Sequence, residues 1–289
     1  MLVDRCQFLS NEQSLPVSSR TTIALNSHAN DVKLRDNRVV MFKHFAVLGG
    51  SGSSITGNHW FHGDETTDGT RKGGIVLTIP NVKSYITGNY IDNNFIEWTN
   101  EHDATPVADS QYSFGGLTVT GNIFTANDVA AWFNWLVIKP FGSGHYIHGL
   151  AVTSNVFRTI NGNIDRIEHV DTTHADLDYG RMRNVTFDAN VFHGVNQEVR
   201  NPLSMTHTQS ARDRIWICDT GTWLPFRGRA RTIESVIPVG RLPDAADAAV
   251  YEFPWTEAEY GSTKRQFRVI FETPVTGTVR AVVRMDNPQ

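Results

Sequence analysis

Carboxylates, histidines and cations gather in three polar segments of a chain in which 40% of all residues are hydrophobic. The segments run from His62 to Lys72, from Glu97 to Asp103 and from Asn161 to Arg181. Two carboxyl groups can serve as general acid and base, and a His, Tyr or Arg side chain can remove or deliver a proton. The candidate catalytic residues are Glu101, His102, Asp103, Glu168, His169, Asp171, Tyr179 and Arg181.

Aromatic and charged side chains near these segments suit a groove that holds a sugar chain. The candidate substrate-binding residues are Asp64, Arg71, Lys72, Trp98, Trp132 and Trp135. Ordinary structural roles stay open for them, because charged runs form solvated turns and large aromatics fill cores. The segment 161–181 is the most acidic, and its oxygens could hold Ca²⁺ in a loop. His169 and His174 are five residues apart, which is not the helical spacing of a zinc protease.

A repeated pattern must position these segments. An apolar-polar-apolar strand leads into an Asn, as in Ile86-Thr87-Gly88-Asn89, and a second apolar strand follows it. Gly tolerates the left-handed backbone conformation that a sharp turn needs, and Asn does so to a lesser degree. The repeated residues are Asn37, Asn58, Asn89, Asn122, Asn155 and Asn190, at intervals of 21 to 35 residues.

Units of this length cannot bury their apolar side alone, but stacked coils can. The repeat therefore predicts an all-β fold, a parallel β-helix, and parallel crossovers favour the right-handed form. Stacking places equivalent residues about 4.8 Å apart, so the Asn side chains should form a hydrogen-bonded ladder. Insertions at one register would emerge on one side of the solenoid. Carboxylates there would lie about 5 Å apart in adjacent coils and about 10 Å apart two coils away.

The rungs Ile86-Thr87-Gly88-Asn89 and Val119-Thr120-Gly121-Asn122-Ile123-Phe124 resemble those of the pectate-lyase-like, single-stranded right-handed parallel β-helix superfamily. The resemblance covers about residues 1–205 of 289 and implies the fold and a carbohydrate-directed surface. It implies no single reaction, because lyases, hydrolases, epimerases and phage tailspikes share the fold. The Asp-Asp and Gly-His-Gly motifs of polygalacturonase-like chains are missing, and Tyr179-Gly180 is followed by Arg181 rather than by an epimerase Asp-Pro-His.

The Asn rungs stop after Asn190, and prolines punctuate the remainder. We expect the β-helix to occupy residues 1–211 and a small antiparallel β module to occupy residues 212–289. Its alternating strands, 266–271 and 278–284, are expected to be joined by a hairpin near Thr276-Gly277. Such a module could cap the open end of the solenoid, form a homotrimer or bind a ligand.

Composition excludes several classes of protein. The formal net charge of −4 gives no overall positive field, so no nucleic-acid partner is expected. Without an apolar run of about 18 residues, no membrane span is expected. Cys6 and Cys218 are too few and too far apart for a disulfide framework. The first residues do not form a signal peptide, and a missing upstream region stays open.

Two hypotheses follow. The first is a carbohydrate-active enzyme, extracellular or on a phage or particle surface, that cleaves or modifies an acidic polysaccharide as a lyase or as a glycoside hydrolase. The second is a non-catalytic glycan-binding or structural β-helix of the phage-tail or surface-fibre type. The missing catalytic motifs and the C-terminal β module favour the second, and the polar segments favour the first.

Overall fold

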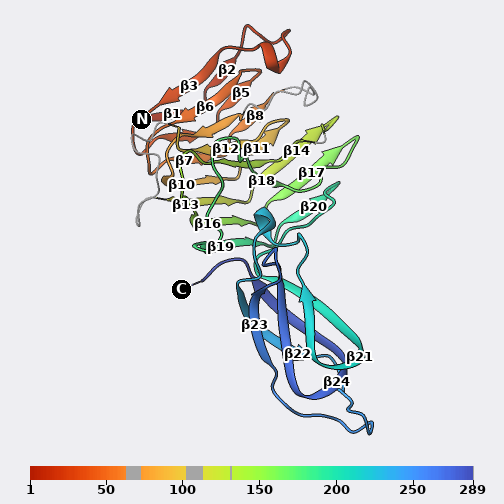
Figure 1. Cartoon of the computed structure of the whole chain (residues 1–289). Helices are drawn as coiled ribbons and strands as arrows, with labels where there is room; N and C mark the ends of the chain where they lie inside the picture. Colours follow the sequence, from red (N-terminus) through yellow and green to blue (C-terminus); the bar gives the residue numbers. More distant parts are fainter. Residues whose placement is uncertain (63–72, 102–112, 131, 289) are drawn as a thin grey trace. The chain divides into compact units, whose positions relative to one another are not determined.

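The computed structural model describes residues 1–62, 73–101, 113–130 and 132–288. The chain divides into two compact units, residues 1–180 with 184–198 and residues 181–183 with 199–289. The first is a parallel β-solenoid and the second is a small antiparallel β unit (Figure 1), which confirms the predicted all-β architecture. The right-handed direction of the coil stays a prediction. None of the helices among the described residues has the length and apolar character needed to cross a membrane.

In the described part of the solenoid, successive coils add strands to three parallel sheets. Sheet A consists of β1 (Leu2–Asp4), β4 (Lys33–Arg35), β7 (Ser54–Thr56), β10 (Asn81–Thr87), β13 (Phe114–Thr120), β16 (Ile147–Thr153) and β19 (Arg183–Asp188). Sheet B consists of β2 (Gln7–Leu9), β5 (Arg38–Val40), β8 (His59–Phe61), β11 (Tyr90–Asp92), β14 (Ile123–Asn127), β17 (Val156–Ile160) and β20 (Val191–His193). Sheet C consists of β3 (Ile23–Ser27), β6 (His44–Leu48), β9 (Ile75–Leu77), β12 (Ile96–Thr99), β15 (Leu136–Lys139) and β18 (Glu168–Val170).

The predicted Asn ladder is present at the turn between sheets A and B. The Oδ1 atom of Asn122 accepts hydrogen bonds from the backbone N–H and the Nδ2 of Asn89, both at 2.9 Å. The same two bonds join Asn37 to Asn58, Asn58 to Asn89, Asn122 to Asn155 and Asn155 to Asn190. Each buried amide thus satisfies backbone and side-chain groups of its neighbours, as buried polar groups require.

The residue before each ladder Asn turns the chain. Gly57, Gly88 and Gly121 have φ values of 69°, 65° and 64°, which lie in the left-handed region. Asp36 and Ser154 take the same conformation at 53° and 56°. Only Gly adopts it without steric cost. The turn therefore depends on the ladder bonds most strongly where a side chain replaces Gly.

The polar segments do not leave the coils at one register, which corrects the expected arrangement. Residues 62–74 and 161–167 connect sheet B to sheet C, whereas residues 100–113 and 171–182 connect sheet C to sheet A. Each of the three polar segments therefore adjoins sheet C, either where the chain enters this sheet or where it leaves it. Sheet C, rather than one turn of the coil, is the element that positions the candidate chemistry.

The antiparallel unit is built around one long strand, β24 (Gln266–Arg284). It pairs with β21 (Leu203–Asp219) on one side and with β22 (Thr232–Pro238) and β23 (Trp255–Tyr260) on the other. The hairpin expected near Thr276-Gly277 is wrong, because β24 continues through these residues and Gly277 pairs with Gln209. β21 also crosses the boundary expected at 211/212, so the unit begins earlier than predicted. Short 3₁₀ turns lie at Val17–Ser19 and Pro225–Arg227.

Candidate functional site

Sheet C has one face in the core and one face that carries polar side chains. In register across the strands, Ile96 pairs with Leu136 and Leu136 with Glu168, while Glu97 pairs with Val137 and Val137 with His169. Because side chains alternate along a strand, these two rows lie on opposite faces. The first row is buried, and in the second row Val137 is buried as well, whereas Glu97 and His169 are half-buried. We call the second face the outer face of sheet C.

Five ionisable residues gather on this outer face and at its border, and we call them the sheet C cluster. They are Glu97, Glu101, Lys139, His169 and Asp171. The Asp171 N–H donates to the Ile138 carbonyl at 2.8 Å, so Asp171 continues the pairing beside Lys139. Electrostatic interactions link Glu97 to Lys139, to Glu101 and to Asp171. The sequence predicted Glu101, His169 and Asp171, and the structure brings these three together.

An aromatic pair lies beside the cluster. The Phe141 and His174 rings stack with centroids 4.1 Å apart and planes at 18°. The Lys139 ammonium lies 5.6 Å from the centroid of the Phe141 ring, within reach of a cation–π attraction. Phe141 is half-buried and His174 is exposed, so the pair offers an aromatic surface next to the carboxylates. Aromatic faces beside carboxylates form the kind of surface on which a sugar ring can rest.

The environment of Glu97 favours its neutral form. Burial raises the pKa of this carboxyl, and the negative charges of Glu101 and Asp171 raise it further. Lys139 acts in the opposite direction but does not reverse the shift. A carboxyl with a raised pKa can keep its proton near neutral pH and deliver it as a general acid.

The pKa of the Asp171 carboxyl is shifted in the opposite direction. Partial burial acts to raise its pKa, but hydrogen bonds from Thr173 and the charges of Lys139 and His169 outweigh burial and lower the pKa. The Thr173 hydroxyl and backbone N–H both donate to Asp171 Oδ1, at 2.5 and 3.1 Å. Asp171 is therefore held as a carboxylate. Two carboxyl groups with separated pKa values are the pattern of an acid–base pair.

Three sequence-predicted residues lie in the core instead. Trp98 and Trp135 are both 0% exposed, and the Trp98 ring packs edge-on against Phe114 at 5.3 Å. Full burial prevents these rings from stacking on a sugar, which corrects the substrate-binding assignment. Glu168 is also 0% exposed, and its Oε1 lies 2.6 Å from the Arg166 guanidinium. Its place on the core face of β18 corrects its assignment as a catalytic carboxylate.

The Arg166–Glu168 pair yields a stability prediction. Arg166→Ala should destabilise the solenoid by about 3–5 kcal/mol, because it leaves a buried carboxylate without its counter-charge. The double variant Arg166→Met/Glu168→Leu should lose less, because it removes both charges. Urea denaturation followed by far-UV circular dichroism would compare them. A double variant less stable than Arg166→Ala would contradict this view of the pair.

The remaining predicted residues are dispersed. Trp132 is half-buried, with its ring centroid 6.0 Å from that of Phe133. Tyr179 is half-buried and belongs to the solenoid unit, whereas Arg181 belongs to the antiparallel unit. Five further candidates, His102, Asp103, Asp64, Arg71 and Lys72, lie outside the described residues.

Comparisons leave the fold without a named relative. No protein-family model matches the chain, and neither a curated protein nor a solved structure matches it significantly. Within the described ranges, no group of three or more His, Cys, Asp and Glu side chains is arranged to hold a metal ion. What the site does must therefore be argued from its own residues.

Sequence reasoning placed Glu97 at the start of a polar segment without selecting it as a site residue, and it missed Lys139 and Phe141. Glu97 interrupts the apolar run Phe95-Ile96-Glu97-Trp98, and Lys139 ends Leu136-Val137-Ile138-Lys139. A lone charge inside an apolar strand is costly unless it faces a polar environment. A lone charge in an apolar strand can be recognised from the sequence, but it does not indicate whether the side chain faces outward. Glu168 on β18 is such a charge and is buried.

Proposed function

We propose that the sheet C cluster hydrolyses a glycosidic bond, with Glu97 as general acid and Asp171 as general base. The supporting observation is the opposite direction of the two pKa shifts on one face of one sheet. Glu97 would protonate the leaving oxygen, and Asp171 would activate a water molecule. Both roles are carried by side chains that lie on or directly beside strands of one sheet, which favours precise positioning.

The strand order favours inversion at the anomeric carbon. β15 lies between β12, which carries Glu97, and β18, which precedes Asp171. Glu97 is in register with His169, and Asp171 lies two residues further along, so two strand spacings and two residue rises separate the backbones of Glu97 and Asp171 by about 12 Å. An inverting pair of carboxyl groups stands about 6.5–9.5 Å apart, which leaves room for a water molecule, and a retaining pair about 5–5.5 Å apart, so the wide backbone separation favours inversion.

We propose that the substrate is a polysaccharide. The protein would act on it outside a cell or on a particle surface. The Phe141–His174 pair would support a sugar ring, and Lys139 offers a positive charge for a uronate carboxylate. An acidic polysaccharide is therefore the first choice. Glu101 and Asp171 limit how many acidic groups can approach, which favours a chain with uronates interspersed among neutral sugars.

A panel of neutral and uronate-containing polysaccharides tests the proposal, with added Ca²⁺ in one arm and a chelator in another. Reducing ends without ultraviolet absorbance would support a hydrolase. Ultraviolet absorbance of unsaturated ends would show that the enzyme is a lyase rather than a hydrolase. Activity that requires Ca²⁺ would support the predicted Ca²⁺ site. Binding without cleavage across the panel would overturn the enzyme in favour of a glycan-binding module.

Phe141→Ala should raise KM about two- to tenfold and leave kcat within about threefold, because stacking on an aromatic ring contributes about 0.5–1.5 kcal/mol to binding. Initial rates on the preferred polysaccharide would separate KM from kcat. Phe192→Ala is the control, since that half-buried ring lies on β20 in sheet B. A fall in kcat with unchanged KM would contradict a binding role for Phe141.

A further inference from the structure

The antiparallel unit exposes a group of large apolar side chains that a water-soluble surface rarely presents. Tyr251 is 95% exposed, Phe253 94% and Trp255 72%. Ile237 on β22 and Ile215 on β21 are 59% and 40% exposed. We call these five residues the aromatic surface. Exposure of 72–95% for three aromatic residues within a five-residue stretch is unlike the scattered single apolar residues of ordinary surfaces.

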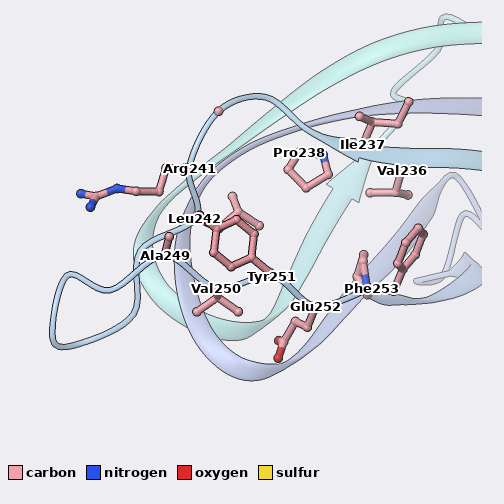
Figure 2. A pocket seen from close by; sticks show the side chains of 12 residues that line it. Val236, Ile237, Pro238, Arg241, Leu242, Ala249, Val250, Tyr251, Glu252 and Phe253 are labelled. Atoms are coloured by element: carbon pink, nitrogen blue, oxygen red, sulfur yellow. The ribbon is translucent and has the colours of Figure 1, made fainter.

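A cavity of about 600 Å³ forms one part of this surface. Figure 2 shows Tyr251 beside Leu242, with Val250, Phe253 and Pro238 from the same lining. The charged groups around it have partners within the unit. Glu252 accepts hydrogen bonds from the Thr273 backbone and hydroxyl at 2.9 and 3.3 Å, and Arg241 pairs with Asp247 at 2.7 Å. The lining therefore favours an apolar occupant over a charged one.

The surface continues from the cavity onto the sheet. Phe253 and Pro254 line the cavity, and Trp255 begins β23 immediately after them. Trp255 pairs with Ile270 of β24, which pairs with Ile215 of β21. Directly opposed residues of antiparallel strands share a face, so this row is apolar across three strands. In the adjacent row, Arg268 forms an ion pair with Glu257, and the two residues together carry no net charge.

The exposed area is close to what a stable protein interface needs. Each aromatic side chain can bury about 150–250 Å², so Tyr251, Phe253 and Trp255 alone offer several hundred Å². Ile237 and Ile215 add to it and bring the total near the roughly 800 Å² that one partner contributes to a standard interface. The largest apolar patch of a typical monomer is only about 300–600 Å².

We infer that the aromatic surface is covered by the same surface of a second copy of this chain. A symmetric assembly places one patch against itself or its equivalent, and this patch suits such contact because Arg241 and Arg268 are neutralised within their own copy. The inference is independent of the proposed hydrolase, because it uses none of the sheet C cluster.

The test is the mass of the full chain in solution, measured by sedimentation velocity from about 1 to 100 μM, a range that detects dissociation constants typical of specific assembly. We expect twice the monomer mass, because a surface that contacts the same surface of a second copy closes a two-fold pair. The variant Tyr251→Ser/Phe253→Ser/Trp255→Thr should raise the dissociation constant at least about 100-fold, as expected when several buried anchors are lost. Its far-UV circular dichroism should be unchanged, since these side chains are exposed.

Tyr85→Ser/Ile123→Ser is the matched control, because it removes residues that are 46% and 48% exposed on the solenoid and should keep the assembly. If the triple variant unfolds, the variant Phe253→Lys tests the inference instead. A charge at this exposed position should leave the fold intact but oppose contact between two copies. A monomeric wild type, or a Phe253→Lys variant that stays assembled, would overturn the inference. A monomer that binds a polysaccharide through Phe253 would assign the surface to a glycan instead.

Discussion

Glu97→Gln and Asp171→Asn should each lower kcat for polysaccharide cleavage by about 10²–10⁴-fold, the range that a positioned acid or base contributes. Gln cannot donate a proton to the leaving oxygen, and Asn cannot accept one from water. An aryl glycoside with a good leaving group should restore much of the rate of Glu97→Gln, because that leaving group needs no protonation. It should not rescue Asp171→Asn, which still lacks its base.

The dependence of activity on pH should follow the pKa shifts of Asp171 and Glu97. Asp171 must be ionised, so activity falls at low pH as the pH drops through its lowered pKa. Glu97 must be protonated, so activity falls at high pH as the pH rises through its raised pKa. The expected profile is a bell whose width reflects the separation of the two pKa values. Glu97→Gln should lose the alkaline limb when it is assayed on the activated substrate.

Stability gives an independent check on Glu97. Its pKa is raised in the folded chain, so the folded state binds the proton more tightly than the unfolded state does. Stability therefore falls as the pH rises from the ordinary carboxyl pKa, about 4.3, through the raised folded value. Glu97→Gln removes this penalty and should raise the melting temperature at pH 7, with little change near pH 3.

Asp188→Asn is the control for both carboxylate variants, because it removes an exposed carboxylate at the end of β19 in sheet A. Its rate and melting temperature should match those of the wild type. The acid–base assignment fails if Glu97→Gln keeps its rate within about threefold of the wild type on the natural polysaccharide, where a general acid is needed.

Asn122→Ala should cost the solenoid about 4 kcal/mol, the largest stability effect expected of an uncharged substitution. Its side chain accepts two hydrogen bonds from Asn89 and donates to Asn155 Oδ1 at 3.0 Å and to the Ile86 carbonyl at 2.9 Å. Ala makes none of these bonds, and each buried group left unsatisfied costs about 1–3 kcal/mol. The Asn122 side chain is 1% exposed, so water cannot simply replace it.

Urea denaturation would measure the loss, and hydrogen exchange of the β10 and β13 amides would show whether it is local to the ladder. Asn163→Ala provides the comparison, since Asn163 is exposed and bonds only to Asn196 Oδ1 among the described contacts, at 3.3 Å. It should change stability by less than about 0.5 kcal/mol. Equal losses for Asn122→Ala and Asn163→Ala would show that the ladder does not stabilise the coil.

Sequence alone predicted the solenoid and its ladder because both depend on a period. Once Asn89 and Asn122 are recognised as equivalent, stacking makes them neighbours regardless of the length of the loops between them. The antiparallel unit has no such period. Thr276-Gly277 resembled a local turn, but pairing along the length of β21 keeps β24 extended through Gly277. Long-range pairing outweighed the local turn preference there.

The candidate site was predictable only in part, for the same reason. Glu101, His169 and Asp171 were selected because they lie inside polar segments, whereas Glu97, at the edge of one, and Lys139 stand within apolar strands. The sequence determined that the coils stack and which residue types reach sheet C. Only the tertiary structure decided that Glu97 faces outward and Glu168 faces the core, because strand register, which the sequence did not reveal, assigns each side chain to one face of the sheet.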